Sequence, residues 1–407
     1  MRGPVSNSPS NPVPASIVRP AVVYFLLFGA VAAYFPYIAV YFRSIGLDLP
    51  AIGLLAALNA GVAVIAAPAW GALVDRVRDV RGPLAVAGLW SAAAATWLAV
   101  TREPILVGIA VAILAAGSAG LGPMLDSRTI QIVGKNRDRY GRARAFGSLA
   151  FTIGALGVGI LIGQTGPQGM FLIYAPGLFL TGVVAYLLLG GRERGTGAPG
   201  RFTTSFASGL SDLVRDPTLL LFFIGSVLVW IAVSAVHTFL SVHLVQLGAS
   251  SALVGLVWTP GALVEVPLML AFPLLVRRVG AERLLVLGGL AFAVRAGLWA
   301  LTSDPLLFVA IAPLGGIGYA LFYVGTVTYV SRAVPPSVQA TAQGLFSGTA
   351  FSIGSILGAV VGGQLAAALT IPGMFAVSAV VTAVGAAIVL WATEARKNRP
   401  SPVSRTI

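Results

Sequence analysis

The chain has 407 residues, of which 57% are hydrophobic and only 10% are charged. Soluble globular proteins carry roughly 25% charged residues, so this composition excludes an ordinary soluble protein. The net charge of +13 would suggest nucleic acid as the partner of a soluble protein, but it also fits the excess of Lys and Arg on the cytoplasmic side of membrane proteins. We therefore expect the lipid bilayer, and no nucleic acid, as a partner.

The sequence offers few groups for catalysis or metal binding. It contains no Cys and only two His, so thiol chemistry and a His-rich metal site are not expected. No nucleotide-binding motif occurs in a strand–helix context, which argues against ATP-driven transport. We expect no enzyme activity, no metal and no cofactor. Of the two His, His243 ends a predicted helix and is expected at the surface.

The apolar residues form runs long enough to cross a bilayer, which takes about 20 residues. We predict twelve transmembrane helices, at residues 20–42, 51–71, 83–101, 104–132, 144–165, 168–190, 217–243, 251–276, 283–302, 304–332, 340–366 and 371–393. The predicted fold is all-α integral membrane, with two pseudo-symmetric six-helix bundles at 20–190 and 217–393. The remaining segments are a disordered tail at 1–19 without a signal peptide, a central loop at 191–216 and a tail at 394–407.

The basic residues set the predicted orientation. If both termini are cytoplasmic, all but three of the 26 Lys and Arg residues lie on or near the cytoplasmic face. The exceptions are Arg43, Arg102 and Arg295, the last inside a predicted helix. Because cytoplasmic loops are enriched in Lys and Arg, we expect a multi-pass protein of the cell inner membrane with both termini and the central loop in the cytoplasm.

The two halves of the chain repeat. The matching pairs, offset by 200 to 202 residues, are Gly46 and Gly248, Gly53 and Gly255, GALVDR at 71–76 and PLLVRR at 273–278, and AFTIGALGVGILIGQ at 150–164 and AFSIGSILGAVVGGQ at 350–364. Parallel repeats of this kind are typical of transporters, whose substrate site lies near mid-membrane between the halves. The repeat therefore indicates a carrier.

The segment after the second predicted helix, and its copy in the second half, resembles the loop signature of the major facilitator superfamily, roughly G-x-L-x-D-R-x-G-R-R. The matching residues are Gly71, Leu73, Asp75 and Arg76 in the first copy and Leu275, Arg278 and Gly280 in the second. The resemblance implies alternating access, with gating loops that contain Gly71, Asp75, Arg76, Arg278 and Gly280. Without it, the charges of these loops are explained by the positive cytoplasmic face alone.

Longer stretches resemble the branch of that superfamily with lactose permease, the phenylpropionate permeases and the nucleoside–proton symporters. They are AAYFPYIAVYF at 32–42, YGRARAFGSLAF at 140–151, the run at 236–269 and VLGGLAFAVRAG at 286–297. The resemblance implies a carboxylate–guanidinium pair of Asp126 with Arg144 at the substrate site, an aromatic contact from Phe151, and a buried Arg295. Lactose permease carries a buried His and Glu on its tenth helix, whereas the stretch IAPLGGIGYALFYVGTVTYV of the tenth predicted helix has no ionisable side chain other than Tyr.

Glu265 and Arg295 lie inside predicted helices, where charges are costly and usually functional. Each is fifteen residues from Gly280, so both are predicted at one depth, ~17 Å from the helix ends. They either form a structural ion pair or serve transport. His237 likewise either packs or relays protons. The stretch that resembles the phenylpropionate permeases includes both Glu265 and His237, and we predict these two as the proton-coupling residues.

The predicted substrate-binding residues are Asp126, Arg144, Phe151, Arg295, Tyr34 and Tyr37. On position alone, Asp126 and Arg144 are also explained as a salt bridge about two turns from the cytoplasmic surface. Tyr34 and Tyr37 lie on one face of the first helix, where they line the cavity or pack.

We expect a secondary active transporter that moves a small organic solute by alternating access, through proton-coupled symport into the cell. Two alternatives stay open at this stage. One is a proton-antiport pump that exports drugs or metabolites, and the other is a non-transporting membrane sensor or scaffold on a transporter fold. The expected partners are the solute and the proton, and the chain is expected to act as a monomer.

Overall fold

The structure, a computed structural model, describes residues 17–134, 137–190, 216–333, 348 and 350–397. Most of the two predicted tails, nearly all of the central loop and the start of the eleventh predicted helix lie outside these residues, whereas residues 18–19 and 394–397 belong to helices α1 and α17. The first half contains α1 (Val18–Tyr34), α2 (Ile38–Ser44), α3 (Leu49–Val77), α4 (Arg81–Val100), α5 (Pro104–Ser118), α6 (Leu121–Val133), α7 (Arg137–Thr165), the short η1 (Pro167–Met170) and α8 (Phe171–Leu188). The second half contains α10 (Pro217–Gln246), α11 (Ser251–Leu256), α12 (Thr259–Val279), α13 (Ala281–Leu301), α14 (Pro305–Ile311), α15 (Pro313–Ala333) and α17 (Phe351–Lys397).

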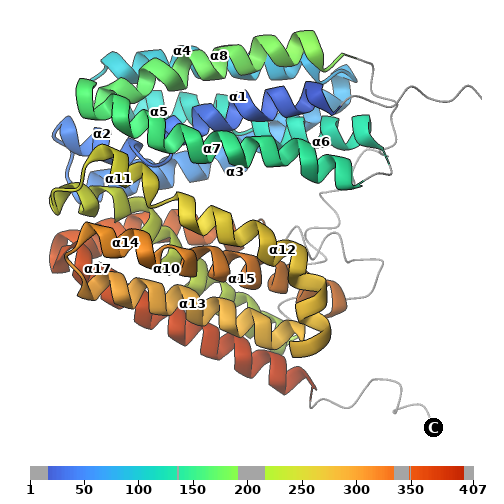
Figure 1. Cartoon of the computed structure of the whole chain (residues 1–407), viewed down its shortest axis with the longest axis vertical. Helices are drawn as coiled ribbons and strands as arrows, with labels where there is room; N and C mark the ends of the chain where they lie inside the picture. The colour runs from blue at the N-terminus through green and yellow to red at the C-terminus, as the bar shows by residue number, and fades with distance from the viewer. Residues whose placement is uncertain (1–16, 135–136, 191–215, 334–347, 349, 398–407) are drawn as a thin grey trace, which may run out of the picture.

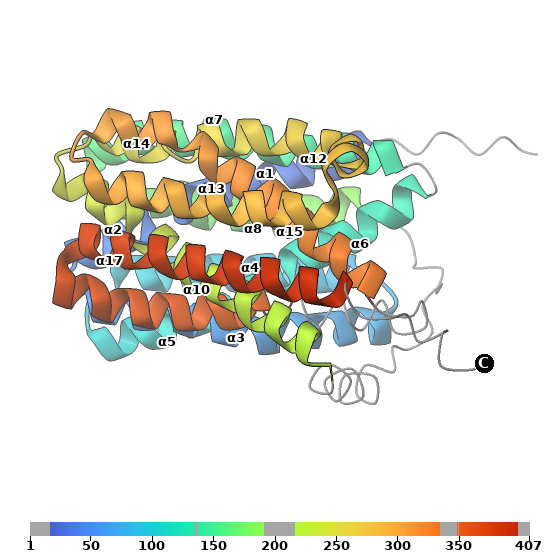
Figure 2. The ribbon, with the colours of Figure 1, turned by 90° about the horizontal axis from the view of Figure 1, so that it is seen from below.

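The predicted all-α membrane fold is confirmed. Eleven stretches of the described residues are long and apolar enough to cross a membrane. The last of them, Phe351–Arg396, is interrupted at Thr370, whose φ of 73° is not helical. Figure 2 shows α17 as two arms that run back along each other from this point. Counting each arm once gives the twelve crossings that the hydropathy pattern predicts.

The helices form two bundles that lie side by side (Figure 1). One contains α1 to α8 and the other contains α10 to α17. Contacts between the bundles are made by α3 with α17, by α7 with α11 and α12, and by α2 with α10. These are the elements that line the interface where the repeat predicts a site.

Several predicted crossings are broken helices. The first crossing is divided into α1 and α2 at Pro36, and the tenth into α14 and α15 just before Pro313. Proline lacks an N–H and clashes with the preceding turn, so a break at these positions is expected physically. The apolar runs are continuous across both breaks, which is why hydropathy does not reveal them.

The segments predicted as gating loops are helical for most of their length. Helix α3 continues through Val77 and ends at Arg78, which has a left-handed φ of 55°. Gly71, Asp75 and Arg76 therefore lie in the last two turns of α3, and the prediction of a loop over 71–76 is wrong. The reason is that nothing before Arg78 breaks the helix, since one Gly costs only about 1 kcal/mol.

The same holds for the second copy. Arg278 lies in the last turn of α12, and Gly280 alone joins α12 to α13, with a φ of +91°. In the first half the corresponding turn is held by Asp79, whose carboxylate accepts hydrogen bonds from the Arg81 side chain at 2.8–3.2 Å. These bonds hold the pKa of Asp79 below its usual value.

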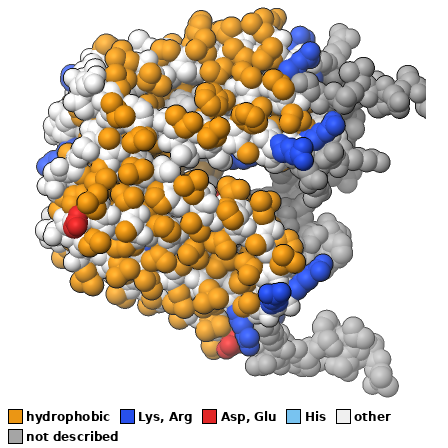
Figure 3. Space-filling view, viewed as in Figure 1, with side chains coloured by type: hydrophobic (Ala, Val, Ile, Leu, Met, Phe, Trp, Pro, Cys, Tyr) orange, Lys and Arg blue, Asp and Glu red, His pale blue; other side chains and the backbone are white. Residues whose placement is uncertain are grey.

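The two ends of the molecule differ in charge. Basic side chains gather at the end where α3, α12 and α17 stop, as Figure 3 shows, and we name this the basic end. We name the opposite end, where α2 and α11 lie, the closed end, because the two bundles contact each other there. Apolar side chains cover the bundle surface between the two, as expected for a protein surrounded by lipid.

Candidate functional site

The two bundles touch closely at the closed end through glycines. A Cβ atom at Gly53 of α3 would collide with the main-chain carbonyl of Ala359 in α17. A Cβ atom at Gly159 of α7 would collide with the Ser251 carbonyl of α11, and one at Gly255 would collide with the Ala155 carbonyl of α7. Only glycine permits this approach of main chain to main chain. Two such contacts, one on each side of the interface, seal this end.

Tyr37 adds a polar contact to the same seal. Its side chain is 1% exposed, and its hydroxyl lies 2.6 Å from the Ala155 carbonyl oxygen and 3.1 Å from the Ser251 carbonyl oxygen. One hydroxyl proton serves an acceptor from each bundle. In this state the Tyr37 hydroxyl is therefore bound to main-chain carbonyl groups. A contact of Tyr37 with substrate stays a prediction.

The bundles separate toward the basic end. A Cβ atom at Gly61, two turns along α3 from Gly53, would be 3.9 Å from the nearest atom of Ile356. At Gly71, two to three turns further, it would meet no other atom of the described residues within 4 Å. Figure 3 shows the surface hollowed between the bundles on this side. The interface is thus a wedge, closed at one end and open at the other.

A larger side chain at the glycine seal is expected to open it. In Gly159→Leu, the new side chain cannot fit beside Ser251, so the closed end should separate. Ala155→Cys provides the reporter, because Ala155 is fully buried and the chain has no native Cys. Alkylation of this thiol by a bulky maleimide should be at least tenfold faster in Gly159→Leu. The control is Gly157→Leu on the same helix, where the added atom meets nothing; equal rates in all three backgrounds would contradict the seal.

Asp126 of α6 and Arg144 of α7 meet near the basic end of the first bundle. The Arg144 Nη1 lies 3.5 Å from the Asp126 Oδ1, and the two side chains are 41% and 35% exposed. The same carboxylate oxygen accepts hydrogen bonds from the Tyr24 hydroxyl at 2.5 Å and the Tyr140 hydroxyl at 3.2 Å. The Arg144 guanidinium lies over the Phe28 ring, 4.9 Å from its centroid. The pair is oriented but still accessible.

Phe151 and Tyr34 are the aromatic residues predicted at the substrate site in the first bundle. Phe151 is half-buried and lies seven residues, two helical turns, after Arg144, so both are on one face of α7. Tyr34 stacks on Tyr174 of α8, with ring centroids 4.5 Å apart. The structure therefore brings Phe151 to the Arg144 face, whereas Tyr34 packs within its own bundle.

Glu265 is half-buried on α12, the helix that borders the wedge in the second bundle. No hydrogen bond or ion pair joins it to another residue of the described part of the chain. The guanidinium of Arg144, in the opposite bundle, is close enough to act on it electrostatically, as is Tyr319 of α15. Glu265 therefore faces the wedge, with the Asp126–Arg144 pair across it.

Arg295 is 5% exposed on α13 and contacts His237 of α10, with 3.2 Å between its Nη2 and the His237 Nε2. A guanidinium only donates hydrogen bonds, so the His237 Nε2 is the acceptor and carries no proton in this state. The guanidinium also lies over the ring of Trp299, 4.7 Å from its centroid. Within the described residues, no ion pair joins Arg295 to Glu265.

Both of these charges lie deep in the protein. Glu265 is 14 residues from the end of α12 at Val279, and Arg295 is 14 residues from the start of α13 at Ala281. At 1.5 Å per residue, each lies ~21 Å from the Gly280 turn. This is deeper than the ~17 Å expected from hydropathy, because the helices extend closer to Gly280 than predicted.

The sequence pattern gives no signal for several residues of the site. Tyr24 and Trp258 contact the predicted charges or their partners, but both types are common packing residues in apolar helices. The expectation of a surface position for His243 is wrong, since it is 4% exposed and lies between the rings of Phe308 and Phe375. Helix α10 extends to Gln246, so His243 lies within the last turn of the helix and is buried there.

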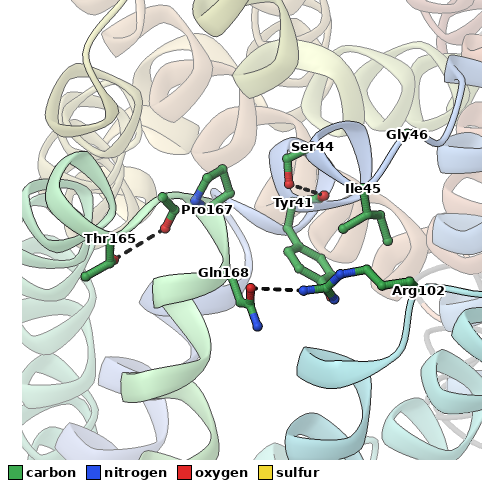
Figure 4. A pocket seen from close by; sticks show the side chains of 9 residues that line it. Tyr41, Ser44, Ile45, Gly46, Arg102, Thr165, Pro167 and Gln168 are labelled. Carbon is green, nitrogen blue, oxygen red and sulfur yellow. Dashed lines mark hydrogen bonds between the residues drawn. The ribbon is translucent and has the colours of Figure 1, made fainter.

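A separate cavity of about 530 Å³ opens at the closed end of the first bundle (Figure 4). Its rim is tied together by Arg102, which donates to the Tyr41 hydroxyl at 2.7 Å and to the Gln168 side-chain oxygen at 2.9 Å. None of the residues predicted to bind substrate lines it. The hydrogen bonds of Arg102 connect the end of α2 with the turns before α5 and α8. The role of Arg102 here is therefore structural.

Comparisons with known proteins agree with the fold. The family model of the MFS_1 like family matches residues 17–375. The chain belongs to this family of major facilitator transporters. The maltose permease of Geobacillus stearothermophilus is 29% identical over 369 residues, which cover 90% of this chain and 92% of that protein. The putative nucleoside transporter YegT of Escherichia coli (strain K12) is 29% identical over 240 residues, 56% of this chain and 55% of that one.

Solved structures show the same architecture. The nucleoside transporter NupG superposes with a TM-score of 0.81 at 18% identity, covering 94% of this chain and 99% of that one. A bacterial homologue of the lysosomal transporter Spinster gives a TM-score of 0.72 at 16% identity, covering 95% and 98%. At this identity the match concerns the fold alone. The family match, together with the apolar spans, makes the chain a multi-pass membrane transporter of the major facilitator type and not an enzyme.

Proposed function

We propose that the transporter is a proton-coupled symporter that takes up a small organic solute by alternating access. The observation that carries the proposal is the wedge, because it brings the Asp126–Arg144 pair of one bundle opposite Glu265 of the other. A solute bound between them contacts both bundles. It therefore stabilises conformations in which the two bundles close around it.

Alternating access needs two interfaces that open in turn. The glycine contacts of Gly53, Gly159 and Gly255 form the seal at the closed end. Asp75 and Arg76 at the end of α3, and Arg278 at the end of α12, are exposed on the two sides of the opening at the basic end. We propose that they meet when this end closes, which is the gating role suggested by their sequence pattern. The basic end then faces the cytoplasm, with both termini on that side.

Glu265 supplies the proposed proton site. A carboxyl group deep in a membrane protein and without a fixed partner gains and loses a proton as its surroundings change, since desolvation and a nearby cation act on it in opposite directions. Between Pro313 and Ser331, α15 has no ionisable side chain other than Tyr, so the broken tenth crossing offers no substitute. His237 is the second candidate, and it carries a proton on Nε2 only when Arg295 moves away.

Transport assays in proteoliposomes test the proposal. The relatives are named for maltose and nucleosides, so radiolabelled maltose and uridine are the first solutes, followed by a panel of small organic acids. With the outside more acidic by one pH unit, we expect a symported solute to accumulate up to about tenfold for each proton that enters. A gradient of the opposite sign should drive the solute out. Accumulation only when the inside is acidic would instead indicate antiport.

A further inference from the structure

The Arg295 guanidinium is surrounded by groups that do not neutralise it. Its hydrogen-bond partner is His237, and its flat faces lie near the rings of Trp299 and Phe292, with centroids 4.7 and 5.3 Å away. Its Nη1 lies against Gly315 in the first turn of α15. The C-terminus of α14 and the N-terminus of α15 meet at Ala312, so their opposite partial charges lie side by side and bring no net negative charge to the guanidinium.

Further N–H donors around Arg295 have no acceptor. The Arg295 Nε, the Trp258 Nε1 and the Trp299 Nε1 are all buried and without a hydrogen-bond partner among the described residues. Trp299 lies under the guanidinium, and Trp258 lies against His237, with ring centroids 5.4 Å apart. A buried donor without an acceptor costs roughly 1–3 kcal/mol, and an unpaired charge costs more. The cation's own Nε and two neighbouring indole N–H groups thus lack an acceptor, which indicates a missing acceptor at this place.

We infer that Arg295, Trp258 and Trp299, beside the first turn of α15, form a binding site for an anionic group, a carboxylate of the substrate or an inorganic anion such as chloride. The inference deepens the proposed function, since it adds a negative charge to the transported solute or a bound co-ion. The anion would accept the unpaired N–H bonds and neutralise the guanidinium. Its position, between the helix break at Ala312 and α12, is the place where discontinuous helices of transporters bind anionic groups.

Glu265 is the carboxylate of the chain that competes with an external anion for Arg295. Of the described elements that pack around Arg295, α12 carries the one carboxylate that lies at this depth. Gly261, one turn before Glu265 on the same face of α12, packs against Ala312 and Gly316. Glu265 therefore lies ~6 Å further along α12, toward the basic end, from the level of the helix break. It makes no contact with Arg295 in this state.

Anion binding is measured on the purified full chain in nanodiscs by thermal unfolding, without any transport step. The probes are sodium acetate, the neutral isostere acetamide, and sodium chloride, each added to the same low-salt buffer that contains no other small anion. For the wild type we expect acetate, chloride or both to raise Tm saturably, by about 3–5 °C at a hundredfold excess over Kd. Acetamide should give no shift. A shift with acetate alone assigns the site to a carboxylate, and one with chloride to an inorganic anion.

Arg295→Gln separates a ligand site from a structural role. If the guanidinium waits for an anion, the variant should lose the acetate and chloride shifts while its own Tm stays equal to or above that of the wild type. Trp258→Phe removes one N–H and keeps the ring, and should weaken anion affinity about three- to tenfold. Three results would overturn the inference: no shift with either anion, shifts that persist in Arg295→Gln, or shifts that arise only in Glu265→Gln, which would make Glu265 the counter-ion.

The two proposals fail separately. If the anions bind but no solute is moved by a pH gradient, the proton-coupled symport is wrong and the anion site remains. If maltose or uridine is accumulated equally by wild type and Arg295→Gln, and neither anion raises Tm, the anion site is wrong and the symport remains.

Discussion

Glu265→Gln is expected to abolish solute accumulation driven by a pH gradient and to leave exchange of solute between equal compartments running. Glutamine keeps the size and hydrogen-bonding ability of the side chain but cannot exchange a proton. With one pH unit across the membrane, worth about 1.4 kcal/mol, wild type should concentrate the solute up to about tenfold for each proton coupled to it, and the variant should reach a ratio near one.

The control for this variant lies on the next span. Glu282, in the first turn of α13, is an acidic residue close to the Gly280 turn and outside the wedge. Glu282→Gln should accumulate solute as wild type does. If Glu265→Gln also accumulates solute under the pH gradient, the proton passes elsewhere, and His237 becomes the residue to test.

Arg144→Gln is expected to weaken solute binding by about ten- to hundredfold, because a charge-assisted hydrogen bond contributes roughly 1.5–3 kcal/mol. The effect on folding should be small. The pair with Asp126 is more than one-third exposed, and such pairs add at most about 1 kcal/mol to stability. Asp126→Asn should act in the same direction, since it removes the carboxylate that orients the guanidinium. Isothermal titration with the solute identified by uptake gives the affinities.

A matched control removes an ion pair that lies outside the wedge. Asp79→Asn breaks the pair with Arg81, whose atoms are 2.8 Å apart, in the turn between α3 and α4. Its solute affinity should equal that of wild type. An affinity loss of the same size in Asp79→Asn and Arg144→Gln would mean that the effect is a general consequence of lost charge pairs, and that Arg144 does not contact the solute.

Much of the fold follows from the sequence, because crossing a membrane imposes a simple length and hydropathy rule. The positions of Glu265 and Arg295 at one depth also follow, since both are counted from the same turn at Gly280. The helix breaks do not follow, because Pro occurs both inside intact helices, as Pro267 in α12, and at breaks, as Pro313 at the start of α15. Which outcome occurs depends on the packing of neighbouring helices.

The sequence pattern does not predict which side chains contact the charged residues inside the helices. Because Glu265 and Arg295 lie at one depth, the sequence suggests that they pair with each other. In the structure Arg295 contacts His237, and Glu265 faces the other bundle. Depth fixes one coordinate, whereas partner choice depends on the rotation of each helix about its axis. Tyr37 shows the same limit, because its use at the seal depends on where α7 and α11 approach each other.

The proposed symport moves solute and proton together through the wedge. Its most direct test is proton entry caused by solute alone, in proteoliposomes that contain a trapped pH-sensitive dye and start without a pH gradient. When the transported solute is added outside, we predict that the interior becomes acidic in wild type and stays unchanged in Glu265→Gln. Uptake of labelled solute by wild type without acidification of the interior would contradict the account.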